Sequence, residues 1–172
     1  MVQCQARADG PVWHTQLAMR GSRVLAASLM RRRGLTLSRG KRILIVDDDP
    51  GVLFIMQAAL LSLGDEYEVV AAEDGVQALG QIRRCAFDLV VTDIRMPGMG
   101  GIELTEAIRA TEPATVVIWM TAYGSDALQA DCQRLGVERC LDKPLRIAGI
   151  RQAVAEALDA PPNKRIGESR HR

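Results

Sequence analysis

The chain of 172 residues has little aromatic content, 3%, and only two histidines, His14 and His171. Aliphatic side chains must therefore fill its core, because hydrophobic residues of all kinds amount to 48% of the sequence. Two histidines so far apart argue against a metal site built from imidazole ligands. The cysteines show no C-x-x-C spacing, so we expect reduced thiols, most of them in packed positions. There are four of them, Cys4, Cys85, Cys132 and Cys140.

Long hydrophobic runs are also missing. The longest apolar stretch, Val52 to Leu63, is interrupted by Gln57 and Ser62, and it falls short of the roughly 20 residues that a membrane helix needs. A shorter run at 24–30 is followed directly by three arginines, which is the wrong flank for a cleaved export signal. We therefore expect no membrane span and a cytoplasmic location.

The two signs of charge occupy different parts of the chain, although the formal net charge is only +1. Residues 1–42 contain nine basic residues and one acidic residue, whereas residues 43–160 contain nine basic and nineteen acidic residues. We expect a folded domain at 41–160, flanked by a disordered basic arm at 1–40 and a disordered basic tail at 161–172. Alternatively, residues 1–29 are a mis-assigned start, because Met30 lies shortly before the first predicted strand.

From Lys41 onward, short apolar runs alternate with helical patterns five times. The first predicted helix has clear ends, with Asp49 as N-cap, Pro50 at its first position and Gly64 after its last. Strands that alternate with helices of this length form a parallel sheet covered on both faces, which defines an α/β fold. The predicted strands are 42–47, 67–72, 88–92, 115–120 and 137–141, and the predicted helices are 50–63, 75–85, 101–110, 126–135 and 145–158.

Polar residues lie at the ends of four predicted strands. Asp47 and Asp48 end the first, Asp93 follows the third, Thr121 follows the fourth and Lys143 follows the fifth. Because ligand sites of parallel sheets form at the carboxyl ends of the strands, we expect these side chains to meet. Neighbouring carboxylates repel one another, and a hard cation with oxygen ligands, such as Mg²⁺, relieves this repulsion. With a hydroxyl and an ammonium beside them, the group suits phosphoryl chemistry.

Four motifs, in this order, resemble those of receiver domains of two-component response regulators. The resemblance covers about two-thirds of the chain, from Ile43 to about Leu158, and implies a flavodoxin-like, doubly wound sheet of five parallel strands in the order 2-1-3-4-5. The motifs are Ile45-Val46-Asp47-Asp48-Asp49-Pro50, the stretch from Asp88 to Gly101, Met120-Thr121-Ala122 and Asp142-Lys143-Pro144.

This resemblance implies a role for each acidic residue of the group. Asp93 is the expected phosphoacceptor. Asp47 and Asp48 are expected to hold Mg²⁺ together with Asp93 and the backbone carbonyl of Arg95. Asp49, in contrast, is expected to act mainly as the N-cap of the helix that follows it.

The same resemblance assigns roles to the residues that follow the last two strands. Thr121 and Lys143 are expected to contact the phosphoryl group and to relay its presence. The Lys143-Pro144 bond is expected to be cis, which X-Pro bonds tolerate. Ala122 is small, as receiver domains require for access of the phosphodonor.

One position departs from the pattern of the family. Receiver domains usually carry Tyr or Phe three residues before the lysine, as a ring that turns inward on activation, and here Cys140 stands there. Tyr123 lies close along the chain and is a candidate substitute. We also hypothesise that Arg95 and Tyr123, which flank the approach of hydrolytic water, set the lifetime of the phosphoryl group.

The resemblance predicts a signalling switch rather than an enzyme, with only self-directed phosphotransfer and autodephosphorylation. A sensor histidine kinase or a phosphotransfer protein is the expected donor. The fourth helix, fifth strand and fifth helix form the expected output face toward a downstream protein, and phosphorylation-dependent dimerisation is a further expectation. Because residues 163–172 are too few for an output domain, we expect a stand-alone, chemotaxis-type regulator.

Two other readings compete with the switch. Asp47-Asp48-Asp49 formally satisfies the Asp-x-Asp motif of haloacid-dehalogenase-type phosphatases, in which Asp47 would be the nucleophile, although a further pair of acids after the lysine strand is missing. A nucleic-acid tether in the arginine-rich arm is disfavoured, because no base-reading fold accompanies it.

Overall fold

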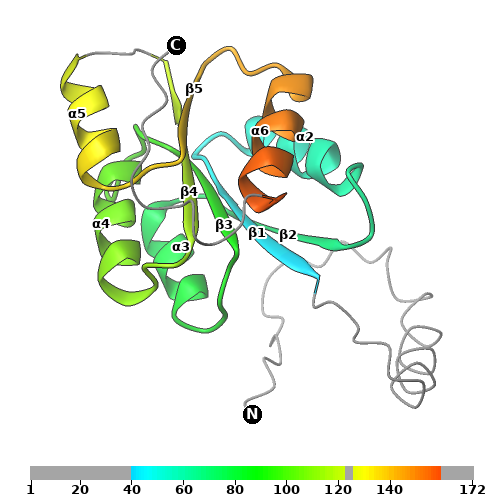
Figure 1. Ribbon diagram of the computed structural model, residues 1–172, viewed down its shortest axis with the longest axis horizontal. Helices are drawn as coiled ribbons and strands as arrows, with labels where there is room; N and C mark the ends of the chain where they lie inside the picture. The colour runs from blue at the N-terminus through cyan, green and yellow to red at the C-terminus, as the bar shows by residue number, and fades with distance from the viewer. Residues whose placement is uncertain (1–39, 123–125, 160–172) are drawn as a thin grey trace. The chain divides into compact units, whose positions relative to one another are not determined.

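The structure, a computed structural model, describes residues 40–122 and 126–159. Five parallel strands form one sheet in the order β2-β1-β3-β4-β5, which confirms the predicted fold (Figure 1). The strands are β1 (Lys41–Val46), β2 (Tyr67–Ala72), β3 (Leu89–Asp93), β4 (Val116–Thr121) and β5 (Arg139–Asp142). The helices are α2 (Pro50–Leu61), α3 (Gly75–Ile82), α4 (Gly101–Thr111), α5 (Asp126–Arg134) and α6 (Ile147–Asp159).

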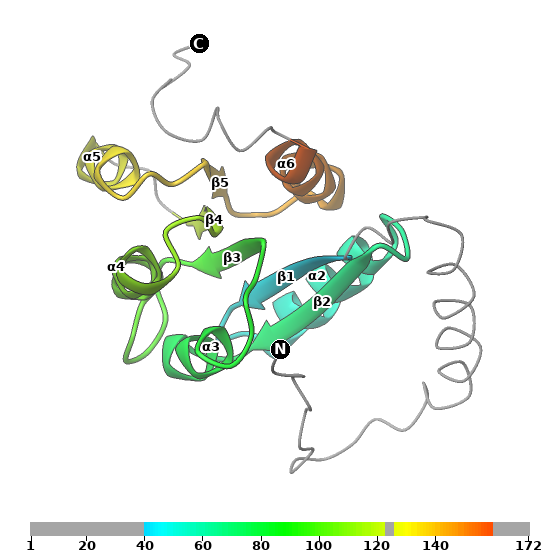
Figure 2. The ribbon, with the colours of Figure 1, turned by 60° about the horizontal axis from the view of Figure 1, so that its bottom comes forward.

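Helices cover both faces of the sheet. Helices α2 and α6 lie on one face, and α3, α4 and α5 lie on the other (Figure 2). The alternation of side chains along β1 explains the two layers, since Ile43 and Ile45 pack under α2 and α6 while Leu44 and Val46 pack under α3 and α4. All four are fully buried. The core is therefore divided by the sheet into two aliphatic layers.

The first helix of the domain begins where the sequence predicts. The side chain of Asp49 accepts hydrogen bonds from the backbone N–H groups of Gly51, at 2.7 Å, and Val52, at 3.4 Å, and Pro50 occupies the first turn. These bonds satisfy donors that the first turn leaves without an intrahelical partner. Asp49 is thus confirmed as an N-cap, which sets it apart from Asp47 and Asp48 before it.

The predicted ends of several elements were wrong by one to three residues. Helix α2 ends at Leu61 instead of Leu63, α3 ends at Ile82 instead of Cys85, and α6 begins at Ile147 instead of Leu145. The predicted strand 137–141 begins at Arg139, because Val137 belongs to the end of α5. There Val137 N–H donates to the carbonyl of Cys132, and Gly136 adopts a φ of +59°, the Schellman arrangement that ends many helices.

The prediction of reduced thiols is wrong, since no cysteine among the described residues is a free thiol. Cys132 on α5 and Cys140 on β5 form a disulfide across the turn that joins the two elements. Their spacing of eight residues belongs to no redox or metal motif, so only the fold brings the sulfurs together. Both side chains are half-buried against the α3–α4–α5 layer of the core.

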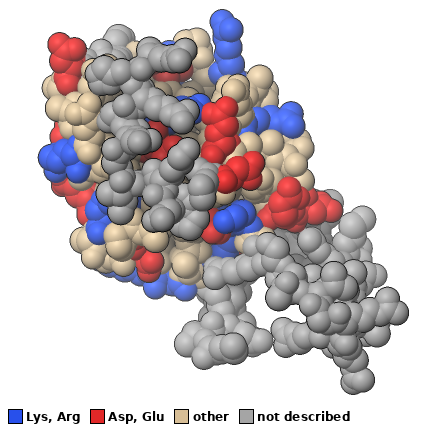
Figure 3. Space-filling view, viewed as in Figure 1, with Lys and Arg blue, Asp and Glu red and all other residues tan. Residues whose placement is uncertain are grey.

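Among residues 40–122 and 126–159, no helix combines the length and the apolar character needed to cross a membrane. Acidic and basic side chains are interspersed over the described part of the face seen in Figure 3. The predicted basic arm, the tail and Tyr123 lie outside the described residues.

Candidate functional site at the carboxyl edge of the sheet

Four neighbouring strands bring the predicted polar residues to one edge of the sheet. Asp47 follows β1, Asp93 is the last residue of β3, Thr121 is the last residue of β4, and Lys143 follows β5. Asp47, Asp93 and Thr121 are buried, at 1%, 8% and 4% exposure. These residues thus lie at the carboxyl ends of parallel strands, where ligand sites of this fold form.

The carboxylates of Asp47, Asp48 and Asp93 form one acidic cluster. One oxygen of each lies within 4.8 Å of those of the other two. Asp48 is exposed, whereas its two partners are buried, so the cluster opens to solvent on the side of Asp48. Oxygen ligands on one side and water on the other suit Mg²⁺, which usually keeps several waters. The donor set therefore fits the predicted cation.

Lys143 joins the two buried carboxylates. Its Nζ atom donates to Oδ2 of Asp93 at 2.6 Å and to Oδ2 of Asp47 at 2.9 Å. Its backbone N–H donates to the carbonyl of Thr121 at 2.6 Å, which ties the lysine to the end of β4. The ammonium thus lies within reach of the Asp93 carboxylate.

Burial and pairing shift the pKa values of two members in opposite ways. For Asp47, burial raises the pKa above its usual value, and the hydrogen bonds from Asp49 N–H and Lys143 only partly offset this. For Lys143, burial alone would lower the pKa, but hydrogen bonds to Asp93 and Asp47 outweigh it and raise the pKa. The site therefore favours the charged form of Lys143, whereas the charged form of Asp47 is only partly compensated for its burial.

Backbone contacts position Asp93. Its Oδ1 atom accepts from the backbone N–H of Arg95 at 3.3 Å, and Ile94 N–H donates to the carbonyl of Met120 at 3.1 Å, which fixes the loop to β4. A Cβ atom on Gly101 would overlap the backbone oxygen of Asp93. The close approach of α4 to the acidic strand end therefore needs glycine here. Gly101 was not among the predicted site residues, although its place at the end of the second motif was a signal.

The remaining predicted site residues are distributed around this group. The Lys143-Pro144 bond is cis, as predicted. Ala122 directly follows Thr121 and is exposed, and the side chain of Arg95 is exposed as well. Cys140 is not at the edge itself but pairs in register with Trp119, two residues before the strand end.

Comparison with known proteins identifies the family. The model of the response regulator receiver domain matches residues 43–155. The chain belongs to the response regulator receiver domain family. It is 41% identical over 119 residues to the transcriptional regulatory protein GlrR of Escherichia coli (strain K12), which covers 68% of this chain and 26% of that protein. It is 36% identical over 141 residues to the sensor protein GacS of Pseudomonas syringae pv. syringae, which covers 77% of this chain and 15% of that protein.

Solved structures show the same fold. A CheY-like receiver domain protein from Methanospirillum hungatei JF-1 superposes with a TM-score of 0.65 and 33% identity, over 69% of this chain and 94% of that one. The chemotaxis protein CheY4 of Vibrio cholerae gives a TM-score of 0.64 and 27% identity, over 69% and 98%. The chain spans about a quarter of the length of the regulators it matches.

The phosphatase alternative receives no support from these comparisons. Its nucleophile would be Asp47, but Asp47 is 1% exposed and both of its oxygens are engaged, one by Asp49 N–H at 3.0 Å and the other by Lys143 at 2.9 Å. Asp93, at 8% exposure, is the more accessible of the two buried carboxylates.

Proposed function

We propose that this chain is a phosphorylation-dependent switch that accepts a phosphoryl group on Asp93 from a sensor histidine kinase or a phosphotransfer protein. The observation that carries the proposal is the meeting of Asp47, Asp48 and Asp93 within 4.8 Å, with Lys143 2.6 Å from Asp93. In this view residues 41–160 form the receiver, and the basic segments 1–40 and 161–172 are its flanking arms.

The proposed step is a displacement at phosphorus. A carboxylate oxygen of Asp93 forms a bond to phosphorus while the bond from phosphorus to the imidazole nitrogen of the donor breaks, and the electron pair leaves with the imidazole. Lys143 exchanges its contact with the carboxylate for one with a phosphoryl oxygen, and Thr121 contributes its hydroxyl. Asp47, Asp48, Asp93 and the Arg95 carbonyl would hold Mg²⁺, which would supply the positive charge that the added phosphoryl group needs.

The change at Asp93 is expected to reach the face formed by α5, β5 and α6. The chain connects the proposed site to this face at two points, since Thr121 precedes α5 and Lys143 follows β5. A downstream protein or a second copy of the chain is the proposed ligand of this face. With Cys140 in place of an aromatic ring, the response is expected to use Tyr123 or the backbone of α5 and β5. Self-directed hydrolysis at Asp93, with its rate set by Arg95 and Tyr123, resets the switch.

Labelling with a small acyl phosphate tests the proposal. The protein is incubated with acetyl phosphate and Mg²⁺, the aspartyl phosphate is reduced with borohydride to homoserine, and tryptic peptides are analysed by mass spectrometry. Cleavage after Arg84 and Arg95 gives the peptide 85–95, which contains Asp93 and also Asp88. We expect Mg²⁺-dependent conversion of Asp93 alone.

Two substitutions in this peptide form a matched pair. Asp93→Asn should abolish labelling. Asp88→Asn, at the opposite end of β3, where Asp88 accepts from Arg42 N–H at 2.9 Å, should leave labelling unchanged. Labelling that persists in Asp93→Asn, or that is independent of Mg²⁺, contradicts the proposal.

A further inference from the structure

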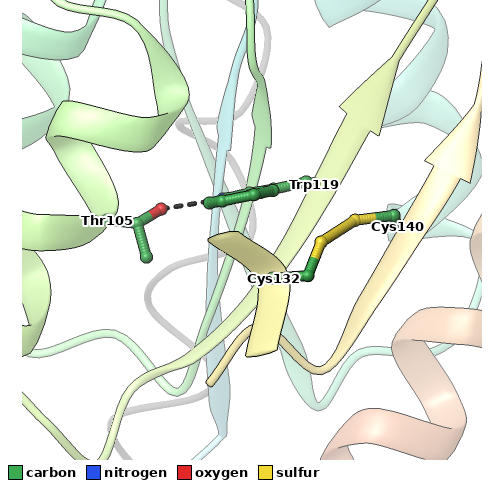
Figure 4. Close-up of a disulfide and its surroundings, with 4 residues drawn as sticks. All are labelled: Thr105, Trp119, Cys132 and Cys140. Atoms are coloured by element: carbon green, nitrogen blue, oxygen red, sulfur yellow. Dashed lines mark hydrogen bonds between the residues drawn. A yellow bond between two sulfur atoms is a disulfide. The ribbon is translucent and has the colours of Figure 1, made fainter. Parts of the chain in front are cut away.

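The disulfide between Cys132 and Cys140 lies within the segment that connects two residues of the phosphoryl site. Thr121 ends β4, α5 carries Cys132, β5 carries Cys140, and Lys143 follows β5. Figure 4 shows the bond bridging α5 and β5 beside Trp119. The disulfide therefore restrains the part of the chain that links Thr121 to Lys143.

The two elements that the bond joins are held very differently. Strand β5 is hydrogen-bonded to β4 in register, with Trp119 opposite Cys140 and Thr121 opposite Asp142. Helix α5 has no fully buried residue. Half-buried side chains such as Leu128 and an exposed ion pair between Arg134 and Glu106 at 3.0 Å hold the helix itself. At its C-terminal end, Arg109 on α4 donates to the carbonyls of Leu135 at 2.7 Å and Gly136 at 2.9 Å. Since exposed ion pairs contribute little, the disulfide adds a covalent constraint to a helix whose own side chains are weakly packed.

We propose that Cys132 and Cys140 are a reversible redox pair that clamps α5 to β5, with a small disulfide such as oxidised glutathione as the oxidant. The thiolate of one cysteine attacks the glutathione disulfide, whose S–S bond breaks and releases one glutathione. The second thiolate then attacks the mixed disulfide and releases the other glutathione. Two electrons and two protons pass from the two cysteines to the oxidant, and one S–S bond forms in the protein.

The exposure of the pair supports reversibility. Both side chains are half-buried, so a small thiol or disulfide can reach them from solvent. Because the bond joins an element that is hydrogen-bonded in the sheet to a helix that has no fully buried residue, it favours, by linkage, the helix position in which the sulfurs are close.

The effect on signalling rests on the function proposed above. If the α5–β5–α6 face responds to the phosphoryl group by moving α5, the oxidised pair restricts that response, and the reduced pair permits it. The chain would then transmit phosphorylation only under reducing conditions.

Peptide mapping tests the bond directly. The full chain with Cys4→Ser and Cys85→Ser retains only the pair, and it is equilibrated with oxidised or reduced glutathione and then digested with trypsin. Cleavage after Arg109, Arg134, Arg139 and Arg146 isolates Cys132 in the peptide 110–134 and Cys140 in the peptide 140–146. We expect these two peptides to be linked after oxidation and separate after reduction. Two glutathione adducts or two thiols after prolonged oxidation would overturn the proposal.

Hydrogen exchange of α5 tests the clamp. Exchange of its backbone amides should be roughly tenfold or more slower in the oxidised than in the reduced protein, because the cross-link removes open states of the segment. Cys132→Ser should exchange at the fast rate under both conditions, and Cys132→Ala serves the same purpose if the serine variant folds poorly. Equal exchange in the oxidised and reduced parent protein would overturn the clamp.

Labelling of Asp93 in the same samples separates the two proposals. A change in α5 exchange on phosphorylation that occurs in the reduced protein and is suppressed in the oxidised protein supports the coupling. An equal change in both contradicts it. Failure of Asp93 to accept label counts against the proposed function, while the peptide linkage and the exchange of the unphosphorylated protein still decide the clamp.

Discussion

The central strands of the sheet and its outer strand β5 differ in how deeply their side chains are buried. Every residue of β3 and β4 is buried. Strand β5 has no fully buried residue and its ends are exposed, and the adjacent α5 has no fully buried residue either. The candidate site takes Asp93 and Thr121 from the buried centre and Lys143 from the end of the exposed strand β5.

This difference assigns separate tasks to the two regions. Side chains that must keep fixed distances for chemistry are best carried by rigid, well-packed elements. Elements that change position are drawn from the weakly packed part of a fold, because opening them costs little free energy. In this domain Asp93, the proposed acceptor, is held by the buried centre, while Lys143 follows the weakly packed strand β5.

Truncating one side chain in each region should give the largest contrast. Ile118→Ala in β4 removes a fully buried side chain and should lower the free energy of unfolding by about 2–5 kcal/mol. Leu128→Ala in α5 removes a half-buried one and should cost about 1 kcal/mol or less. Urea denaturation under reducing conditions measures both. Equal losses would show that α5 is as tightly packed as the centre.

The hydrogen bond between Trp119 and Thr105 should give the next largest effect. The indole N–H of the fully buried Trp119 donates to the hydroxyl of Thr105 on α4 at 2.8 Å (Figure 4). Thr105→Val keeps the shape but leaves the buried donor without a partner, which should cost about 1–3 kcal/mol. Urea denaturation followed by circular dichroism measures the loss.

Thr111→Val is the matched control on the same helix. Thr111 makes the same kind of bond to the carbonyl four residues earlier, at 3.0 Å, as Thr105 does at 2.6 Å, but its side chain is exposed. Its substitution should change the stability by less than about 0.5 kcal/mol. A loss as large as that of Thr105→Val would mean that the backbone bond, and not the indole, is responsible.

The central region is also where the sequence predicted best. Strands β1, β3 and β4 are apolar runs buried on both faces, so their positions in the sequence are easily predicted. The polar residues at their ends then meet because the carboxyl ends of parallel strands lie at the same edge of the sheet. Asp49 was correctly separated from Asp47 and Asp48, since its proline neighbour marks a helix start.

The β5 side was predicted less well, for a physical reason. Val137 is apolar and precedes a strand, so a pattern of hydrophobicity assigns it to that strand. In the structure its N–H closes the end of α5, a backbone interaction that leaves no hydrophobic signature. The pairing of Cys132 with Cys140 depends on that same turn, so it could not be inferred from their spacing. Gly101 was not predicted because it bears no functional group and acts only by leaving room for the backbone of Asp93.

The smallest predicted effect concerns the loss of folding stability that the buried Asp47 carboxylate causes. Asp47 is 1% exposed, and burial raises its pKa, so the ionised carboxylate destabilises the folded state at neutral pH when no cation is bound. Asp47→Asn should therefore raise the free energy of unfolding without Mg²⁺, by about 1 kcal/mol, a usual size for one substitution. Asp49→Asn is the control, because asparagine caps a helix equally well.

The dependence on pH and on Mg²⁺ fixes the cause. A carboxyl group with a raised pKa in the folded state costs stability above that pKa, and the cost disappears as the pH falls through it. The advantage of Asp47→Asn should thus be largest at neutral pH and shrink toward acid. Added Mg²⁺ should stabilise the parent protein more than the variant, since only the parent offers all three carboxylates. An advantage that persisted unchanged in acid or in Mg²⁺ would place its origin in packing instead of charge.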